Sequence, residues 1–162
     1  MRISPASKAS KGVTLIEMMV VVAIIGLIVA VAAPSVSAGI DAVRMTSAAD
    51  EVATFLNSAV NRSVRRQEPL ELVISLKDNK LNLYSNDPNF NRELKMPEGI
   101  QIEAVLPKVQ DDPEEARRLI LMPGASVPGI GIQLANHRNG KRLIRLDPMT
   151  GFPRIQNVTG AE

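Results

Sequence analysis

The stretch KGVTLIEMMVVVAIIGLIVAVAAP, residues 11–34, decides the fold of this chain of 162 residues. Residues 13–33 are apolar apart from Thr14, Glu17 and Gly26. These 21 residues would form a helix about 32 Å long, close to the thickness of the hydrocarbon core of a bilayer. We therefore expect residues 13–33 to span a membrane.

The charges before this stretch predict its orientation. Arg2, Lys8 and Lys11 precede it, and no acidic residue occurs among the first twelve positions. Flanks rich in Lys and Arg resist translocation, so we expect a cytoplasmic N-terminus and a C-terminal part outside the cytoplasm. A cleaved secretory signal peptide is the alternative, with Ser37-Ala38 or Ala32-Ala33 imitating its cleavage site. Against it, the apolar run is long and carries an acid near its start.

Glu17 needs a physical reason, because a lone carboxylate inside a membrane is unfavourable. One interpretation is a capping box, in which Thr14 and Glu17 satisfy the free N–H groups of the first helical turn. The other starts from cleavage between Gly12 and Val13, which creates an α-amino group one turn before Glu17. This amine can pair with Glu17 of its own chain or of a neighbour, and a pair between chains makes burial of both charges favourable only in an assembly. We favour the second interpretation, since intramembrane acids are usually functional.

The residues of this segment resemble a known family. Lys11-Gly12, the following VTLIE and an apolar stretch that ends at Pro34 are similar to the N-terminal signature of type IV pilins and type II secretion pseudopilins. The resemblance implies that a prepilin peptidase cuts after Gly12 and methylates Val13, and that Glu17 aids assembly. It also implies partners: other pilins or pseudopilins and an inner-membrane assembly platform. Val13 departs from the pattern, in which the first mature residue is usually Phe.

Beyond Pro34, which we expect to kink or break the helix or to end the membrane span, a helical period continues to about residue 66. The apolar positions recur three or four apart and predict an amphipathic helix whose stripe packs on a sheet. This stripe comprises Val36, Ile40, Val43, Val52, Phe55, Leu56, Ala59 and Val60.

From residue 70 onward the apolar period is two, which indicates strands. We expect a hairpin over residues 70–83 around Asp78-Asn79, short strands near residues 100–102 and 119–121, and an acidic loop over residues 107–117. A second hairpin is expected over residues 130–146 around Asn139-Gly140, with an edge strand within residues 152–158. A long helix followed by antiparallel strands is an α+β arrangement.

The strand and glycine pattern of residues 119–151 is similar to that of GspH/FimT-type minor pseudopilins. We therefore expect four segments: a basic leader over residues 1–12, a transmembrane and assembly helix over 13–34, an amphipathic helix over 35–66, and a periplasmic β-rich domain over 67–162. The implied protein is a single-pass component of a bacterial inner membrane. The implied function is that of a minor pseudopilin of a type II secretion system, with a minor type IV pilin that binds DNA for uptake as the alternative.

Charge gives a further candidate site. Residues 118–162 hold six basic and two acidic residues, whereas residues 67–117 hold six and eleven. A basic stripe that contacts the phosphates of DNA is one interpretation, since FimT-like proteins use basic surfaces in DNA uptake. A solvated strand face or a contact with an acidic neighbouring subunit is the other. The stripe would comprise Arg138, Lys141, Arg142, Arg145 and Arg154.

No pattern supports an enzyme, a cofactor or a small-molecule substrate. The chain has no cysteine and one histidine, His137, which we expect in a surface loop. Asp87, Asn89, Asn91 and Glu98 imitate the spacing of a calcium loop, but Arg92 replaces the glycine of its sharp turn. We therefore interpret residues 87–98 as a polar loop without metal.

Overall fold

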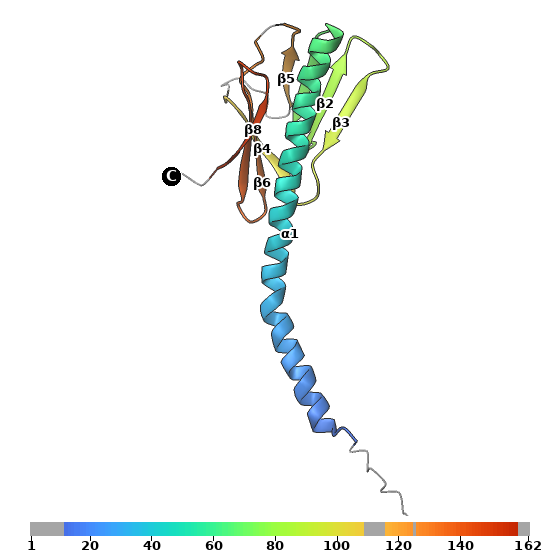
Figure 1. The fold of residues 1–162 in the computed structure, drawn as a ribbon, viewed down its shortest axis with the longest axis vertical. Helices are drawn as coiled ribbons and strands as arrows, with labels where there is room; N and C mark the ends of the chain where they lie inside the picture. The colour runs from blue at the N-terminus through green and yellow to red at the C-terminus, as the bar shows by residue number, and fades with distance from the viewer. Residues whose placement is uncertain (1–11, 109–115, 125, 159–162) are drawn as a thin grey trace, which may run out of the picture. The chain divides into compact units, whose positions relative to one another are not determined.

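The computed structural model describes residues 12–108, 116–124 and 126–158, and the chain divides into two compact units, Met1–Gly39 and Ile40–Glu162. One helix and eight strands lie within the described residues (Figure 1). The helix is α1 (Leu15–Arg66), and the strands are β1 (Leu70–Ser75), β2 (Lys80–Ser85), β3 (Asn91–Lys95), β4 (Ile100–Leu106), β5 (Ala116–Leu121), β6 (Gly131–Asn136), β7 (Lys141–Leu146) and β8 (Pro153–Asn157). The predicted α+β class is confirmed.

Helix α1 is continuous through Pro34, so the expected break there is wrong. Proline removes one backbone hydrogen bond, but the turn before it contains Ala30, Ala32 and Ala33, which favour the helix. The helix ends at Arg66 because Gln67 has a left-handed backbone with φ of 54°. The N–H of Glu68 then bonds to the carbonyl of Ser63 at 3.3 Å, a closure common at helix ends.

The first unit exposes its apolar side chains. Val13, Leu15 and Ile16 are between 67 and 80% exposed, and the apolar window of the helix has no buried residue. α1 is the one helix among the described residues that is long and apolar enough to cross a membrane. Lipid or other apolar helices must cover such a surface, because water does so at a cost of roughly 25 cal/mol per Å².

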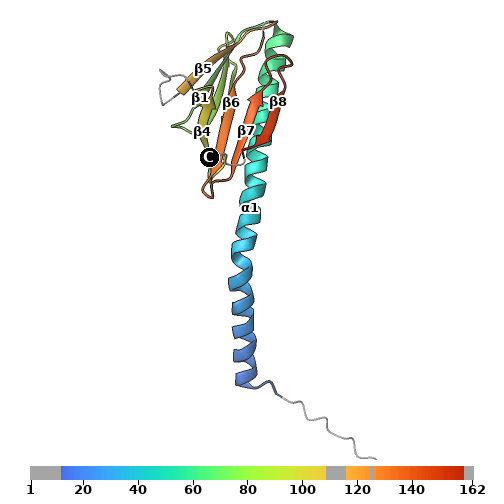
Figure 2. The ribbon, with the colours of Figure 1, turned by 90° about the vertical axis from the view of Figure 1, so that its left-hand side faces the viewer.

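The strands form two antiparallel sheets, in the orders β3-β2-β1-β5 and β4-β6-β7-β8 (Figure 2). β1 and β2 are the predicted first hairpin, with Leu72 opposite Leu83. β6 and β7 are the second, with Ile132 opposite Ile144, and Asn139 in its turn has a positive φ of 59°. β8 is an edge strand that begins at Pro153, where a missing N–H is tolerated.

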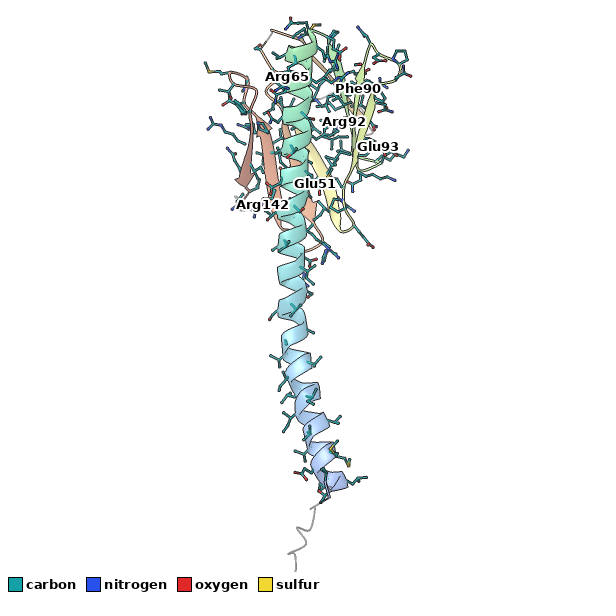
Figure 3. All side chains as sticks on the ribbon, turned by 45° about the vertical axis from the view of Figure 1, so that its right-hand side comes forward. Glu51, Arg65, Phe90, Arg92, Glu93 and Arg142 are labelled. Atoms are coloured by element: carbon teal, nitrogen blue, oxygen red, sulfur yellow. The ribbon has the colours of Figure 1, made fainter. Side chains whose placement is uncertain are left out.

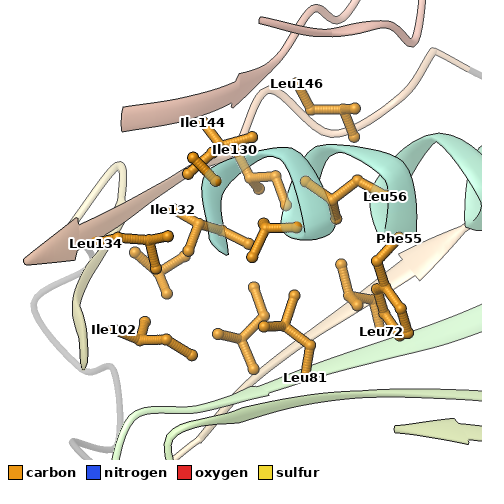
Figure 4. Packing of buried hydrophobic residues seen from close by; sticks show 14 of the residues in the cluster. Phe55, Leu56, Leu72, Leu81, Ile102, Ile130, Ile132, Leu134, Ile144 and Leu146 are labelled. Carbon is orange, nitrogen blue, oxygen red and sulfur yellow. The ribbon is translucent and has the colours of Figure 1, made fainter. Parts of the chain in front are cut away.

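The core of the second unit lies between α1 and the inner faces of both sheets (Figure 4). The helix contributes small and large side chains in turn, with Ala48, Ala49 and Ala59 allowing close approach of the sheets. Leu72 and Leu81 come from the first sheet. The second sheet contributes, among others, Ile102, Ile132, Leu134, Ile144 and Leu146.

Asn79 connects the two sheets. It lies in the turn between β1 and β2 with a φ of 53°. Its amide group donates to the carbonyl of Ile100 at 2.7 Å, and its side-chain oxygen accepts from the N–H of Ile102 at 2.8 Å. Its own carbonyl accepts from the N–H of Met96 at 3.0 Å. One turn residue of the first sheet thereby fixes the position of β4 in the second.

Three further expectations from the sequence need correction. The apolar stripe does not pack on a sheet along its whole length, because Val36, Ile40 and Val43 are 61, 48 and 69% exposed and the core begins at Met45. The polar loop expected over residues 87–98 contains strand β3, and Ala116 and Arg117 belong to β5. Residues 109–115 of the expected acidic loop lie outside the described residues.

Candidate processing and assembly site

Gly12 and Val13 lie immediately before the helix. A Cβ atom built on Gly12 meets no atom within 4 Å, and its φ lies outside the left-handed region that favours glycine. Neither sterics nor backbone conformation within the described residues therefore requires a glycine here. Val13 is 67% exposed and not helical, so the bond between the two residues is accessible.

Thr14 caps the helix beside Glu17. The Thr14 Oγ1 accepts a hydrogen bond from the N–H of Glu17 at 3.3 Å, which is one half of the capping box. No reciprocal bond from the Glu17 carboxylate is seen among the described residues, where this side chain is exposed and without an ion pair. Its charge lies near the positive end of the helix dipole. With respect to the residues that the structure describes, the carboxylate is thus free to accept a partner.

The five basic residues of the predicted stripe do not form one surface. In β7, Lys141 and Arg145 lie on the outer face of the sheet, whereas Arg142 shares the inner face with Ile144. Arg154 is opposite Arg145 in β8 and therefore shares its face. Arg138 lies in the turn before β7.

Three of the five also have acidic partners. Arg138 Nε lies 2.9 Å from Asp41 Oδ2, Lys141 Nζ 2.5 Å from Glu103 Oε1, and Arg154 Nη2 3.2 Å from Asp147 Oδ2. Arg142 and Arg145 form no ion pair among the described residues. A phosphate backbone would have to compete with these carboxylates for most of the charge.

The Asp41 contact was not foreseen from the sequence. The turn between β6 and β7 brings His137 Nε2 to 3.3 Å and Arg138 Nε to 2.9 Å from the Asp41 carboxylate, whose side chain is 13% exposed. His137 is an exposed turn residue, as expected, and its contact with Asp41 is one that its position in the chain does not reveal. These contacts hold the hairpin tip against the start of the helical part of the second unit.

Glu103 lies at a bulge in β4, between Ile102 and Ala104. Hydrogen bonds from Lys141 and Gln133 lower the pKa of this carboxyl below its ordinary value of 4.5. Similarly, the backbone N–H of Met149 lowers the pKa of Asp147, which forms the turn before β8. Both carboxylates therefore favour the folded state in the ionised form.

Glu103→Gln should remove part of the acid sensitivity of folding. A lowered folded pKa stabilises the fold above the unfolded pKa, and this contribution is lost as pH falls through the folded value. Above pH 4.5 the variant should therefore unfold at a lower denaturant concentration than wild type. Its free energy of unfolding should be lower by at most about 1 kcal/mol, because the pair of Glu103 and Lys141 is partly exposed. Below pH 4.5 the difference should shrink, and it should disappear once the pH is below the lowered folded pKa of Glu103. Urea titrations of the full chain in nonionic detergent, with Glu98→Gln as the control, measure it; an unchanged difference at pH 3 would contradict it.

The described residues offer no metal centre, since no group of three His, Asp or Glu side chains comes together among them. The arrangement at the N-terminus is of another kind. It combines an accessible glycine bond, a capped helix start, a free acid and a long apolar surface. This class of architecture is an α+β protein with a membrane-compatible N-terminal helix.

Residues 7–33 match the family model described as the prokaryotic N-terminal methylation motif. This motif marks type IV pilin-like proteins, so the N-terminal segment of this chain is type IV pilin-like. The motif implies processing by a prepilin peptidase and interaction with other pilins in general. No curated protein sequence and no solved structure matches the chain significantly. The resemblance of residues 119–151 to GspH/FimT-type proteins stays a prediction.

Proposed function

We propose that this protein is a minor pseudopilin of a type II protein secretion system. It is inserted in the bacterial inner membrane with its N-terminus in the cytoplasm and its β-rich part in the periplasm. After cleavage behind Gly12 it assembles through its N-terminal helix into a short periplasmic pseudopilus on an inner-membrane assembly platform. Its role is structural, and we propose no catalysis, cofactor or small-molecule substrate for it.

One observation carries this proposal: a free acid stands in the first turn of an exposed apolar helix, directly after an accessible glycine bond. Burying an unpaired carboxylate in a membrane costs about 2.5 to 3.5 kcal/mol. Cleavage supplies a cation one turn away, and a neighbouring subunit places its own terminus within reach of Glu17. The pairing stabilises the assembled helices more than the separate ones, so the acid drives assembly.

Glu17→Ala should leave membrane insertion unchanged and reduce incorporation into filaments roughly tenfold, the effect of losing about 1.4 kcal/mol. The measurement compares membrane-bound and sheared filament fractions by quantitative immunoblotting. Glu98→Ala, which removes an exposed acid from the second unit, is the control. Normal incorporation of Glu17→Ala would contradict the charge pairing. Loss of both variants from the membrane would instead indicate a folding defect.

The alternative, a minor type IV pilin that captures DNA with the five basic residues, has less support. Three of these residues are paired with acids, and Arg142 faces away from the outer surface of its sheet. Deleting the protein from its own bacterium separates the two functions. Impaired protein export with normal DNA uptake supports the pseudopilin, and the reverse result supports the DNA-binding pilin.

A secreted binding domain with a cleaved signal peptide is the third possibility. The apolar helix argues against it, because α1 runs without a break from Leu15 to Arg66 and its C-terminal part belongs to the core. A mature protein that begins near Pro34 or Gly39 would overturn the pilin-like processing proposed above.

A further inference from the structure

A groove runs between α1 and β3 in the second unit. One stretch of 510 Å³ is lined by Phe90 and by basic and polar residues of the last helical turns. A second stretch of 390 Å³ continues along the helix past Thr54 and Phe55. Ser58 and Arg92 line both stretches, so the two form one continuous depression. Figure 3 shows Phe90 and Arg92 on the other side of α1 from Arg142, with Arg65 on the last turns of the helix.

Four arginines line one end of this groove. Arg62 is held in place, because its Nε bonds to Glu68 Oε1 at 3.1 Å and its guanidinium lies 3.6 Å from the centre of the Phe90 ring. Arg65, Arg66 and Arg92 are exposed and have no ion pair among the described residues.

The helix dipole accounts for part of this cluster only. Cations in the last turn offset the negative end of the dipole, which explains Arg65 and Arg66. Arg92 comes from a different element, and its side chain lies on the inner face of β3, toward the groove. The convergence of guanidinium groups from two elements is typical of a site for carboxylates or phosphates.

The other end of the groove is acidic. Asp50 and Glu51 line it, and both are exposed. A nucleic-acid strand that followed the groove would meet these two carboxylates, so the charge pattern disfavours it. A peptide with acidic side chains in one half and basic side chains in the other would match both ends.

The dimensions fit an extended peptide. From Ser47 to Arg65 the helix rises about 27 Å, which an extended chain covers with about eight residues. β3 borders the groove and pairs only with β2 among the described residues, so its other edge keeps unpaired backbone groups. Such an edge favours an extended segment, whose main chain it can bond.

We propose that this groove binds an extended segment of about eight residues from a partner protein, with its carboxylates among Arg62, Arg65, Arg66 and Arg92 and its basic side chains beside Asp50 and Glu51. The proposal goes beyond the proposed function and does not depend on which export system the protein serves. It assigns to the globular unit a contact surface separate from the N-terminal helix.

Fluorescence anisotropy with the full chain in nonionic detergent tests the proposal. The first probe is a labelled octapeptide in which threonine alternates first with two glutamates and then with two lysines. The second probe has the same sequence in reversed order, and the third has a scrambled sequence. All three peptides have the same composition and net charge, so nonspecific electrostatic attraction to the protein contributes equally to the binding of each. We expect one ordered peptide to bind about tenfold more tightly than the scrambled one, and Arg92→Ala or Arg65→Ala to remove that preference.

Arg145→Ala is the matched control, since it removes an exposed arginine from the other sheet. It should bind the ordered peptide as wild type does. Circular dichroism identifies variants that fail to fold, and exposed Arg65 keeps the test informative if Arg92→Ala misfolds. Equal binding of ordered and scrambled peptides would overturn the proposal. Displacement of the bound peptide by a twelve-nucleotide single strand of thymidines at equal concentration would overturn it in favour of a nucleic-acid site.

Discussion

Gly12→Val should leave most of the protein uncut, with its twelve-residue leader still attached. Apart from its chain neighbours, no described residue lies within 4 Å of a Cβ at this position, so the substitution causes no clash within the described part of the protein. The loss must arise in the peptidase, whose site has to accept the residue before the cut bond. Adding a branched side chain to a closely fitting site costs about 1–3 kcal/mol, which lowers the processed fraction roughly tenfold to a hundredfold.

Intact-mass and N-terminal analysis of membrane-extracted protein measures this result. Wild type should begin at Val13 with a methylated amine, whereas Gly12→Val should begin at Met1. Gly26→Val is a suitable control, because a Cβ at Gly26 also meets no atom within 4 Å and the residue lies inside the apolar helix. Efficient cleavage of Gly12→Val at the same bond would contradict the assignment of this glycine as the recognition residue.

Asn79→Ala should cause the largest loss of stability among the polar substitutions discussed here. Two side-chain hydrogen bonds to Ile100 and Ile102 disappear, at about 0.5–1.5 kcal/mol each. Alanine must also adopt a φ of 53°, which costs roughly 1–2 kcal/mol for a residue with a Cβ. The sum is roughly 2–5 kcal/mol in the free energy of unfolding.

Asn139→Ala is the matched control for this prediction. Asn139 has a similar φ of 59° but no side-chain hydrogen bond among the described residues. In Asn139→Ala the free energy of unfolding should therefore fall only by the cost of the backbone conformation, roughly 1–2 kcal/mol. Urea denaturation of both variants, in the same detergent, compares them directly. If the two variants lose equal stability, the connection between the sheets through Asn79 contributes nothing measurable.

Much of this fold could be predicted from the sequence, because the helical period and the strand period of its apolar residues are local patterns. The apolar run after Gly12 predicts the first helix, and alternation such as Leu70, Leu72 and Ile74 predicts β1. Asn79 and Asn139 lie in the turns that were predicted at these positions, and both have a positive φ. Strand β3 could not be predicted in this way, because Leu94 is the single apolar residue of NRELK and an edge strand needs little burial.

The end of the apolar stripe illustrates a different limit. Val36, Ile40 and Val43 follow the same period as Val52 and Leu56, yet only the latter two are buried. Periodicity identifies one face of a helix but not the element that covers it. In this chain the core begins at Met45, and the hairpin that contacts Asp41 comes from almost a hundred residues further along the chain.

The candidate sites also differ in how far the sequence alone could predict them. Gly12, Val13 and Glu17 are neighbours in the chain, so their arrangement follows from helix geometry. The basic residues of β7 and β8 depend on strand register, which placed Arg142 on the opposite face from Arg145. The arginine groove combines the end of the helix with Phe90 and Arg92, and no local pattern indicates that these residues meet.

Seven core side chains come from the helix between Met45 and Ala59. A single protease cut after Arg66 would therefore not release a folded β-rich domain. Without the helix that covers both sheets, the strands would aggregate through their exposed leucines and isoleucines. A water-soluble fragment for crystallisation must keep the helix from Asp41 onward. It then retains both the core and the contact between Asp41 and Arg138 of the second hairpin.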